Sequence, residues 1–403
     1  MKNGHILCPN WLSGHRKSRF SDGLGGYHRD SVIDFVKGVG IILMVFRHAN
    51  GPHSDFVLLF HMAIFFIASG WLINLKYSAD IPSILVYIKK KLRGLWVPYV
   101  GFNVAYLVLN NLFIKLNILT NDPEFLEAKG LDGRYLHLTQ PMGVIKTGKE
   151  IIKVFLFQGG TDMGGALWFF NTLFFVLILY MILQFVLCRI MKDSHIELAQ
   201  LIVAILFLVA GYCCQRHGIS AHGLSRVLSY YCFIYLGHVF HKYNVFNTKI
   251  KPFILFTASL LVLLLMYHHG SINLSGNDYP NPVYLIVASV AGWTMLYSLG
   301  MMLQKTKIFT SVLQYISIHS VPIVGMHFLC FKIVSLIAVL ALGMKMYMIA
   351  AFPVLELPGA WWLFYTVVGI SIPLLADRVW IMVRRRILAR LNIPGSGYHH
   401  SAE

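Results

Sequence analysis

The sequence contains about ten apolar runs, each close to the length that crosses a lipid bilayer. A membrane-spanning helix needs about 20 predominantly apolar residues, because the hydrocarbon core of a bilayer is roughly 30 Å thick. The predicted spans are 33–49, 56–75, 95–116, 166–188, 198–214, 226–241, 252–268, 282–303, 320–342 and 359–383. We therefore predict an all-α fold, a polytopic integral membrane helical bundle with about ten transmembrane helices.

The composition agrees with this fold class and excludes several others. Hydrophobic residues make up 57% of the chain and charged residues 13%, against roughly 45–50% and about 25% in ordinary soluble proteins. A disordered chain, a coiled coil and most soluble enzymes are therefore excluded. The net charge of +17 would suggest nucleic-acid binding in a soluble protein, but here the basic residues lie in short loops between apolar runs. We expect no nucleic-acid partner.

The distribution of lysine and arginine predicts the orientation of the chain. These residues concentrate in both termini and in one alternate set of loops, namely 76–94, 189–197, 242–251 and 304–310. Short basic loops remain on the cytoplasmic side, and long loops count little. We predict a protein of the cytoplasmic (plasma) membrane with both termini cytoplasmic. Its predicted regions are an N-terminal tail at 1–32 without a cleavable signal peptide, a membrane domain at 33–383 and a basic tail at 384–403.

Two stretches outside the spans have amphipathic character. The outer loop 117–165 is the only extramembrane stretch long enough to hold structure, and its end, 148–160, is a candidate short interfacial helix. The terminal stretch 378–391 is basic and amphipathic, and we expect it to lie on the anionic inner leaflet. The cysteines have no CxxC spacing and mostly lie in apolar spans, so we expect them to be buried hydrophobes and predict no metal site.

The first span carries charged residues, and charges inside a membrane helix mark a functional question. Asp34 and Lys37 are three residues apart and can pair on one helix face. His48 is eleven residues after Lys37, so Lys37, Ile41, Met44 and His48 form one stripe, with Lys37 and His48 about 16 Å apart along the axis. A cation and an imidazole then face the same groove. The alternative is that Lys37 extends to the inner surface and His48 lies in the outer headgroup region.

Further polar residues follow in or beside later spans. His61 lies one turn inside the second span, where a packing role is the alternative to a site. The stretch 87–99 places Lys89, Lys90, Lys91 and Arg93 at the predicted cytoplasmic face. Such a cluster is either a topology signal that contacts lipid or a phosphate-binding patch.

The fourth and ninth spans also begin with polar residues. Trp168 opens the fourth span and is typical of the interfacial aromatic belt, whereas Asn171, one turn deeper, is suited to bond a neighbouring helix or a substrate. Ser320 and His327 lie near the start of the ninth span. Alone, each of these positions is weak evidence for a site.

Together these segments resemble the membrane-bound acyltransferase family 3. The matching segments are RDSVIDFVKGVGIILMVFRH (29–48), FHMAIFFIASGWL (60–72), IKKKLRGLWVPY (88–99), GGALWFFNTLFF (164–175), YYCFIYLGHVF (230–240) and YISIHSVPIVGMHF (315–328). The family signature in the first span is a basic residue, ten intervening residues and a histidine, which Lys37 and His48 match. The second and fourth of these segments resemble the fucose 4-O-acetylase-like branch.

The resemblance implies transfer of an acetyl or other short acyl group from cytoplasmic acyl-CoA to a hydroxyl. The acceptor is usually a carbohydrate, here a cell-surface polysaccharide or its lipid-linked precursor. Acetyl-CoA would be a co-substrate, with no permanently bound cofactor, and membrane lipids would be the other partners. Family members often show a Gly-Lys/Asn-Ser pattern where this chain has Ser317-Ile318-His319-Ser320, so the resemblance gives His319 no role.

These observations lead to a specific assignment of roles. We predict His48 as the general base, because imidazole titrates near neutral pH and takes up hydroxyl protons readily, with Lys37 as the second catalytic residue. The predicted acyl-CoA-binding residues are Asp34, Lys37, Lys91 and Arg93. The predicted acceptor-binding residues are His61, Trp168, Asn171, Ser320 and His327.

Two rival functions remain open. A secondary transporter or exporter of a glycan or lipid-linked sugar also suits charged residues within spans. Its usual mark, two halves with matching interrupted helices, is not evident. A structural or sensing membrane protein leaves the register of Lys37 and His48 unexplained.

Overall fold

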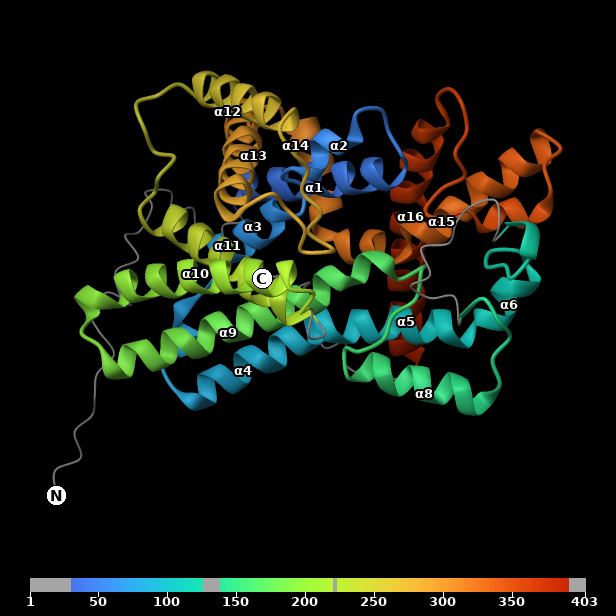
Figure 1. Cartoon of the computed structure of the whole chain (residues 1–403), viewed down its shortest axis with the longest axis horizontal. Helices are drawn as coiled ribbons and strands as arrows, with labels where there is room; N and C mark the ends of the chain where they lie inside the picture. Colours follow the sequence, from blue (N-terminus) through green and yellow to red (C-terminus); the bar gives the residue numbers. More distant parts are fainter. Residues whose placement is uncertain (1–29, 126–137, 220–222, 391–403) are drawn as a thin grey trace.

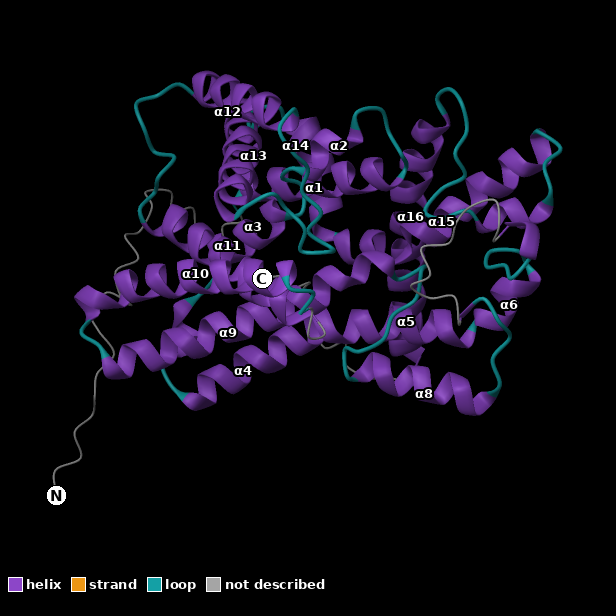
Figure 2. Ribbon diagram, in the orientation of Figure 1, coloured by secondary structure: helices purple, strands orange, loops and turns teal. Residues whose placement is uncertain are grey.

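The computed structural model describes residues 30–125, 138–219 and 223–390, and these ranges are mostly helical (Figures 1 and 2). The helices are α1 (Ser31–His48), α2 (Ser54–Leu58), α3 (Ala63–Trp71), α4 (Ile81–Lys91), α5 (Val97–Val108), α6 (Asn110–Lys115), α8 (Val144–Phe155), α9 (Trp168–Ile190), α10 (Asp193–Arg216), α11 (Leu224–Lys242), α12 (Pro252–Tyr267), α13 (Pro282–Leu303), α14 (Lys307–Ile318), α15 (Ser320–Ala341) and α16 (Trp361–Arg390). Shorter helical segments are η2 (Leu75–Ser78), η3 (Leu92–Trp96), η5 (Gly165–Leu167) and η7 (Met346–Ala350). The predicted N-terminal tail lies almost entirely outside the described residues, as does most of the C-terminal tail.

Each predicted span coincides with one or more helices. Six helical stretches are long and apolar enough to cross a membrane, namely Ser54–Trp71, Gly165–Ile190, Asp193–Arg216, Pro282–Leu303, Ser320–Ala341 and Trp361–Ile387. The others depart from a simple span for local reasons. Helix α1 contains Asp34, Lys37 and Arg47, and α12 has only 16 residues. The all-α, polytopic membrane fold class is confirmed.

Several stretches predicted as loops are helical. The predicted loop 76–94 contains α4, which begins where the Asp80 side chain accepts a hydrogen bond of 2.8 Å from the Ser83 backbone N–H. It continues into η3, a π-helical segment, and then into α5. Most of the predicted loop 304–310 belongs to α14. The outer loop contains α8, which begins four residues before the helix predicted at 148–160. Each element is too short or too polar to be recognised as a span.

Two glycines allow α3 and α11 to pack with their backbones in close contact. A Cβ atom on Gly70 would lie 2.2 Å from the Ile234 carbonyl oxygen, and one on Gly237 would lie 2.0 Å from the Ile67 carbonyl oxygen. Without a hydrophobic driving force between helices in lipid, small residues of this kind are what permit close helix approach. The pair fixes α11 against the helix that forms one wall of the site described below.

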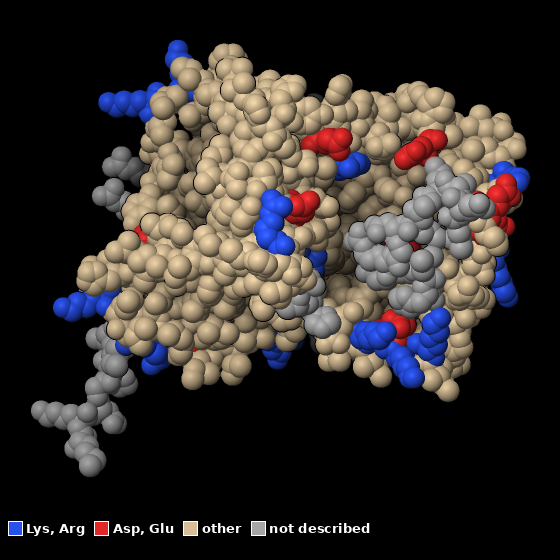
Figure 3. Space-filling model, in the orientation of Figure 1, with Lys and Arg blue, Asp and Glu red and all other residues tan. Residues whose placement is uncertain are grey.

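The surface of the bundle is largely uncharged. Helices α10, α12 and α16 carry exposed apolar side chains along their length, including Ile205, Leu265 and Phe364. Figure 3 shows that Lys and Arg occupy only scattered patches of the face in view, one of them over α8. This surface suits contact with lipid rather than with water.

Candidate active site

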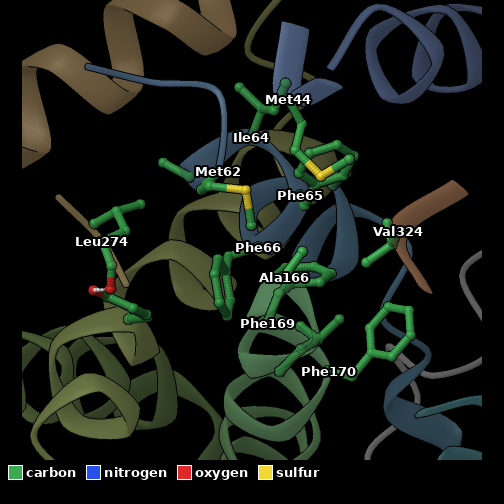
Figure 4. Packing of buried hydrophobic residues seen from close by; sticks show 14 of the residues in the cluster. Met44, Met62, Ile64, Phe65, Phe66, Ala166, Phe169, Phe170, Leu274 and Val324 are labelled. Carbon is green, nitrogen blue, oxygen red and sulfur yellow. Dashed lines mark hydrogen bonds between the residues drawn. The ribbon is translucent and has the colours of Figure 1, made fainter. Parts of the chain in front are cut away.

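A cavity of about 240 Å³ lies among α1, α3, α4, η3, α9 and α15. It is small beside the roughly 300–1,000 Å³ of typical ligand pockets, so a slender, extended ligand suits it best. Most of its wall is apolar, and Figure 4 shows part of that wall at close range. The apolar lining includes Ile41, Met44, Met62, Phe65, Ala166, Phe169, Phe170 and Val324.

One end of the cavity is basic. Three lysines line the cavity, namely Lys37 near the start of α1 and Lys90 and Lys91 at the end of α4. The Lys91 ammonium lies 5.1 Å from the centre of the Tyr87 ring. A cation over an aromatic face is held in place electrostatically. The structure thus places Lys37 and Lys91, both predicted to bind the donor, on one cavity, and it adds Lys90.

The predicted stripe on α1 follows the cavity wall. Lys37, Ile41 and Met44 all line it, and His48 is one turn further along the same helix. Asp30 starts α1 by accepting hydrogen bonds from the backbone N–H groups of Val32 and Ile33, which sets the position of the helix start. The register that separates the cation from the imidazole is therefore present in the structure.

His48 meets a second histidine from a distant part of the chain. Its Nδ1 lies 2.9 Å from Nε2 of His327 on α15, with the two imidazole planes 7° apart. Nδ1 of His327 lies 2.8 Å from the carbonyl oxygen of Ile323 on its own helix. His327 was predicted to bind the acceptor, and the structure places it in direct contact with His48.

This network assigns the tautomers of both histidines. The Ile323 carbonyl can only accept, so Nδ1 of His327 carries the proton and its Nε2 has the lone pair. Nδ1 of His48 must then donate to that lone pair, which leaves Nε2 of His48 as an unprotonated nitrogen in the neutral pair. A histidine with one nitrogen oriented by a hydrogen bond and the other carrying a lone pair has the arrangement that a general base requires.

The histidine pair lies just beyond the cavity rather than in its wall. Met44 is one turn before His48 on α1, and Val324 is three residues before His327 on α15, and both line the cavity. The Phe328 ring covers the pair, with its centre 4.7 Å from that of His48 and 4.1 Å from that of His327. Met44 and Val324 therefore lie between the basic cavity and the imidazoles. Met44 is unbranched and can change rotamer at low cost.

Asp34 lies deeper in the bundle than predicted. Its buried carboxylate accepts a hydrogen bond of 3.0 Å from the Ser317 hydroxyl on α14. The contact joins the start of α1 to the helix that precedes α15, which carries His327. Within the described residues Asp34 does not line the cavity, and its contact with Ser317 ties the start of α1 to α14.

Two other predicted residues, His61 and Arg93, are not among the described residues that line the cavity. His61 is buried, and its Nδ1 lies 2.9 Å from the Val57 carbonyl oxygen in the same helical stretch, which matches the packing alternative. Arg93 lies in η3 with an exposed side chain and, among the described residues, is not part of the cavity wall, although Gly94 beside it is. Gly94 and Leu95 of the π-helical turn line the cavity, as do Lys90 and Lys91 at the end of α4. Such turns often occur at functional sites.

Trp168 and Asn171, predicted to bind the acceptor at the start of the fourth span, contact protein groups other than the two histidines. The Arg226 guanidinium lies 5.4 Å from the centre of the Trp168 ring, and Asn171 donates to the Phe157 carbonyl oxygen at 3.3 Å. Both contacts are with protein groups that stabilise this end of α9. Ser320, by contrast, lines the cavity together with Lys37 and Lys91.

Comparison with known families accounts for this arrangement. The family model of Acyl_transf_3, described as an acyltransferase domain, matches residues 30–378, which include the cavity and both histidines. The chain belongs to acyltransferase family 3. No curated protein and no solved structure matches it. Membership makes the protein a membrane acyltransferase and does not favour the transporter.

Sequence reasoning missed one pair within the family 3 domain. Nδ1 of His319, at the break between α14 and α15, lies 2.6 Å from a carboxylate oxygen of Asp377 on α16. The pair joins the helix break to the last helix and so fixes where α15 begins. The sequence signal was a histidine immediately before a predicted span start, but its partner is 58 residues away. Among the described residues, no group of three or more metal-ligating side chains is present.

Proposed function

We propose that this member of acyltransferase family 3 transfers an acetyl or other short acyl group from acyl-CoA to a carbohydrate hydroxyl. The observation that carries the proposal is the His48–His327 pair, which lies one helical turn beyond a narrow apolar cavity with a basic end. The resemblance to the fucose 4-O-acetylase-like branch supports a sugar acceptor, such as a surface polysaccharide or its lipid-linked precursor.

The cavity suits an acyl-CoA donor at both ends. Lys37, Lys90 and Lys91 would bind the phosphates of the nucleotide, because ammonium groups are effective point charges for phosphate oxygens. The pantetheine arm is long and slender and would occupy the apolar part of the cavity. The separation of about 16 Å between Lys37 and His48 along α1 is comparable to the length of that arm. A shift of the Met44 side chain would then expose the thioester to the histidine.

In the proposed reaction, Nε2 of His48 takes the proton of the acceptor hydroxyl while the hydroxyl oxygen attacks the thioester carbonyl carbon. The new C–O bond forms, the C–S bond breaks, and the proton passes from His48 to the departing CoA thiolate. His327 accepts the Nδ1–H hydrogen bond throughout and so holds the catalytic tautomer. It acts as a positioning residue, as the carboxylate does in a Ser-His-Asp triad.

The proposed location follows from the charge distribution of the loops. The basic loop 76–94, which holds Lys90 and Lys91, would face the cytoplasm together with both termini. The protein would then lie in the plasma membrane and would take up acyl-CoA from the cytoplasm. The basic C-terminal part of α16 would contact anionic lipid headgroups.

The experiment that tests the function measures release of the CoA thiol by the purified full-length protein in lipid nanodiscs. We expect acetyl-CoA to release thiol when a glycan acceptor is present and an O-acetylated product to appear by mass spectrometry. His48→Ala should abolish both signals, whereas His268→Ala, at an exposed histidine at the end of α12, should retain them. Turnover in the His48→Ala protein at the rate of the His268→Ala control would contradict the mechanism.

A further inference from the structure

The connection between α15 and α16 folds back along α15 instead of crossing the end of the bundle. Lys332 of α15 is 3% exposed, and its Nζ donates to the carbonyl oxygens of Ala350 and Ala351, at 3.3 Å and 2.5 Å. Lys332 lies nine residues before Ala341, the end of α15. At ~1.5 Å per residue, the connection therefore reaches roughly 14 Å down the helix from that end.

Irregular backbone at this depth needs a reason. In a membrane protein it is tolerated only where it packs on protein or lines a water-filled space, because lipid satisfies no hydrogen bonds. Lys332 satisfies two of the carbonyls, and Ile349, Ala351 and Leu355 are buried against the bundle. Burying an ammonium group costs free energy. A surface loop would not require such a residue, so we take Lys332 as the group that holds this connection in place.

Phe352, the residue after Ala351, places its aromatic ring against the ring that covers the histidine pair. Phe352 is 45% exposed, and its ring centre lies 4.8 Å from that of Phe328. Phe328 is the ring that covers both His48 and His327. A single side chain therefore separates an exposed aromatic surface from the proposed general base.

A second segment borders the same rings and contributes polar groups. A Cβ atom on Gly165 would lie 3.3 Å from the Phe328 ring and 3.5 Å from the Phe352 ring, so η5 passes close to both. Just before it, Thr161 donates to the Asn103 side chain and fixes the turn. Asp162 lies within this turn and is only partly buried, and its backbone carbonyl accepts a hydrogen bond of 2.9 Å from the Gly165 N–H.

This aromatic surface is separate from the donor cavity. Among the described residues, the cavity wall includes Met44 and Val324 but neither Phe328 nor Phe352. The histidine pair thus has the basic cavity on one side and the Phe328–Phe352 rings on the other. Direct transfer of a group between two bound molecules requires both to reach the base at once, and two surfaces on either side of the pair allow that.

We propose that Phe352, backed by Phe328 and flanked by Asp162, is the binding surface for a pyranose ring of the acceptor. This rests on the proposed function. A pyranose has an apolar face of C–H bonds, which packs on the electron-rich face of an aromatic ring, while its hydroxyls need a few placed polar groups. Lys332 is a positioning residue that holds the loop carrying Phe352 at the depth of the histidines.

The test measures sugar binding and acyl transfer on the same preparations. The full-length protein is placed in lipid nanodiscs, because detergents with sugar headgroups would compete for the surface. The probes are the methyl glycopyranosides of glucose, galactose, mannose and fucose, with sorbitol as a control that has the hydroxyls without the ring face. Binding is measured by saturation-transfer NMR, acyl transfer by thiol release, and acetyl-CoA affinity by calorimetry.

We expect at least one pyranoside to bind the wild type and sorbitol not to bind. Phe352→Ala should weaken pyranoside binding and raise the acceptor KM by at least about tenfold, with acetyl-CoA affinity within twofold of wild type. Phe352→Trp should restore binding, and Phe352→Leu, which keeps apolar volume but no ring, should not. Phe253→Ala, at an exposed phenylalanine on α12, is the matched control and should behave as wild type.

Several outcomes would overturn the proposal. These are an acceptor KM unchanged by Phe352→Ala, equal binding of sorbitol and pyranosides, or no pyranoside binding to the wild type. Pyranoside binding that depends on Phe352 without any acyl transfer would leave this surface in place and reject the proposed function. Acyl transfer that does not depend on Phe352 would support the proposed function and reject Phe352 as the sugar-binding surface.

Discussion

The hydrogen bond between His48 and His327 makes a quantitative prediction about which substitutions impair the reaction. If Nε2 of His48 is the general base, His48→Ala should lower kcat by about 10²- to 10⁴-fold, the usual contribution of such a group. The KM for acetyl-CoA should change little, because the cavity wall is formed by other residues, including Lys37 and Lys91. The substitution removes an interaction made in the transition state rather than in the bound donor.

The effect of changing His327 follows from the hydrogen bond that it accepts. His327→Leu leaves the Nδ1–H of His48 without its partner, 2.9 Å away in the wild type. A buried donor left unsatisfied costs about 1–3 kcal/mol, which corresponds to a loss of about 5- to 150-fold in kcat if His48 must be held in one tautomer. His327→Gln supplies a carboxamide oxygen that can accept the same hydrogen bond, so it should retain most of the activity.

The two histidines should also behave as one unit. The double variant His48→Ala/His327→Leu should be no slower than His48→Ala alone, because His327 acts only through the base. The assay is thiol release from acetyl-CoA with a glycan acceptor, with size-exclusion chromatography as the test of folding. A His327→Leu protein as active as the His327→Gln protein would refute the tautomer assignment. A well-folded His48→Ala protein with a rate near that of the wild type would refute the role of His48 as the general base.

Three further predictions concern the donor and the packing. Lys37→Ala should raise the acetyl-CoA KM at least severalfold and Lys37→Arg should retain affinity, since a cation on the cavity wall contributes to binding rather than to chemistry; equal KM values in a titration would contradict this. Lys91→Gln should raise the same KM more than Arg93→Gln, because of these two described residues Lys91 lines the cavity and Arg93 does not; a larger effect of Arg93→Gln would contradict the role of Lys91 and favour a topology signal. Gly70→Ala and Gly237→Ala should each cost about 1–3 kcal/mol and lower the Tm, because the added Cβ meets a backbone oxygen. Gly101→Ala, where a Cβ meets nothing within 4 Å, is the control, and an equal Tm for all three variants would contradict the close approach.

The helices of this fold were predictable because their signal is local. An apolar run of about 20 residues can be read without knowing what it packs against, and the stripe Lys37, Ile41, Met44 and His48 needs only the helical repeat. Short elements such as α4 and α14 carry no such signal. They were predicted as loops because a helix of 11 or 12 residues depends for its stability on tertiary packing.

The contacts between side chains in the site could not be predicted from local sequence patterns. His48 and His327 are 279 residues apart in sequence, and their meeting depends on how α15 crosses α1. The same applies to the contact between Asp34 and Ser317 on α14, residues that are 283 positions apart in sequence. Polar residues at span starts, such as Trp168 and Asn171, were assigned to the acceptor by depth alone, and depth does not determine which neighbour they face.

The relation between the histidines and the two proposed binding surfaces bears on how hydrolysis is avoided. An acyl donor next to a general base reacts with water unless water is excluded or the base is held back. Met44 and Val324 lie between the donor cavity and His48, and Phe328 covers the histidines from the other side. Both barriers are apolar, so neither offers water a hydrogen bond. Phe328 also contacts Phe352. A sugar bound on the Phe352 ring would therefore also affect the position of Phe328, the aromatic side chain next to the proposed base. Acceptor binding and access to His48 would then depend on the same two aromatic side chains.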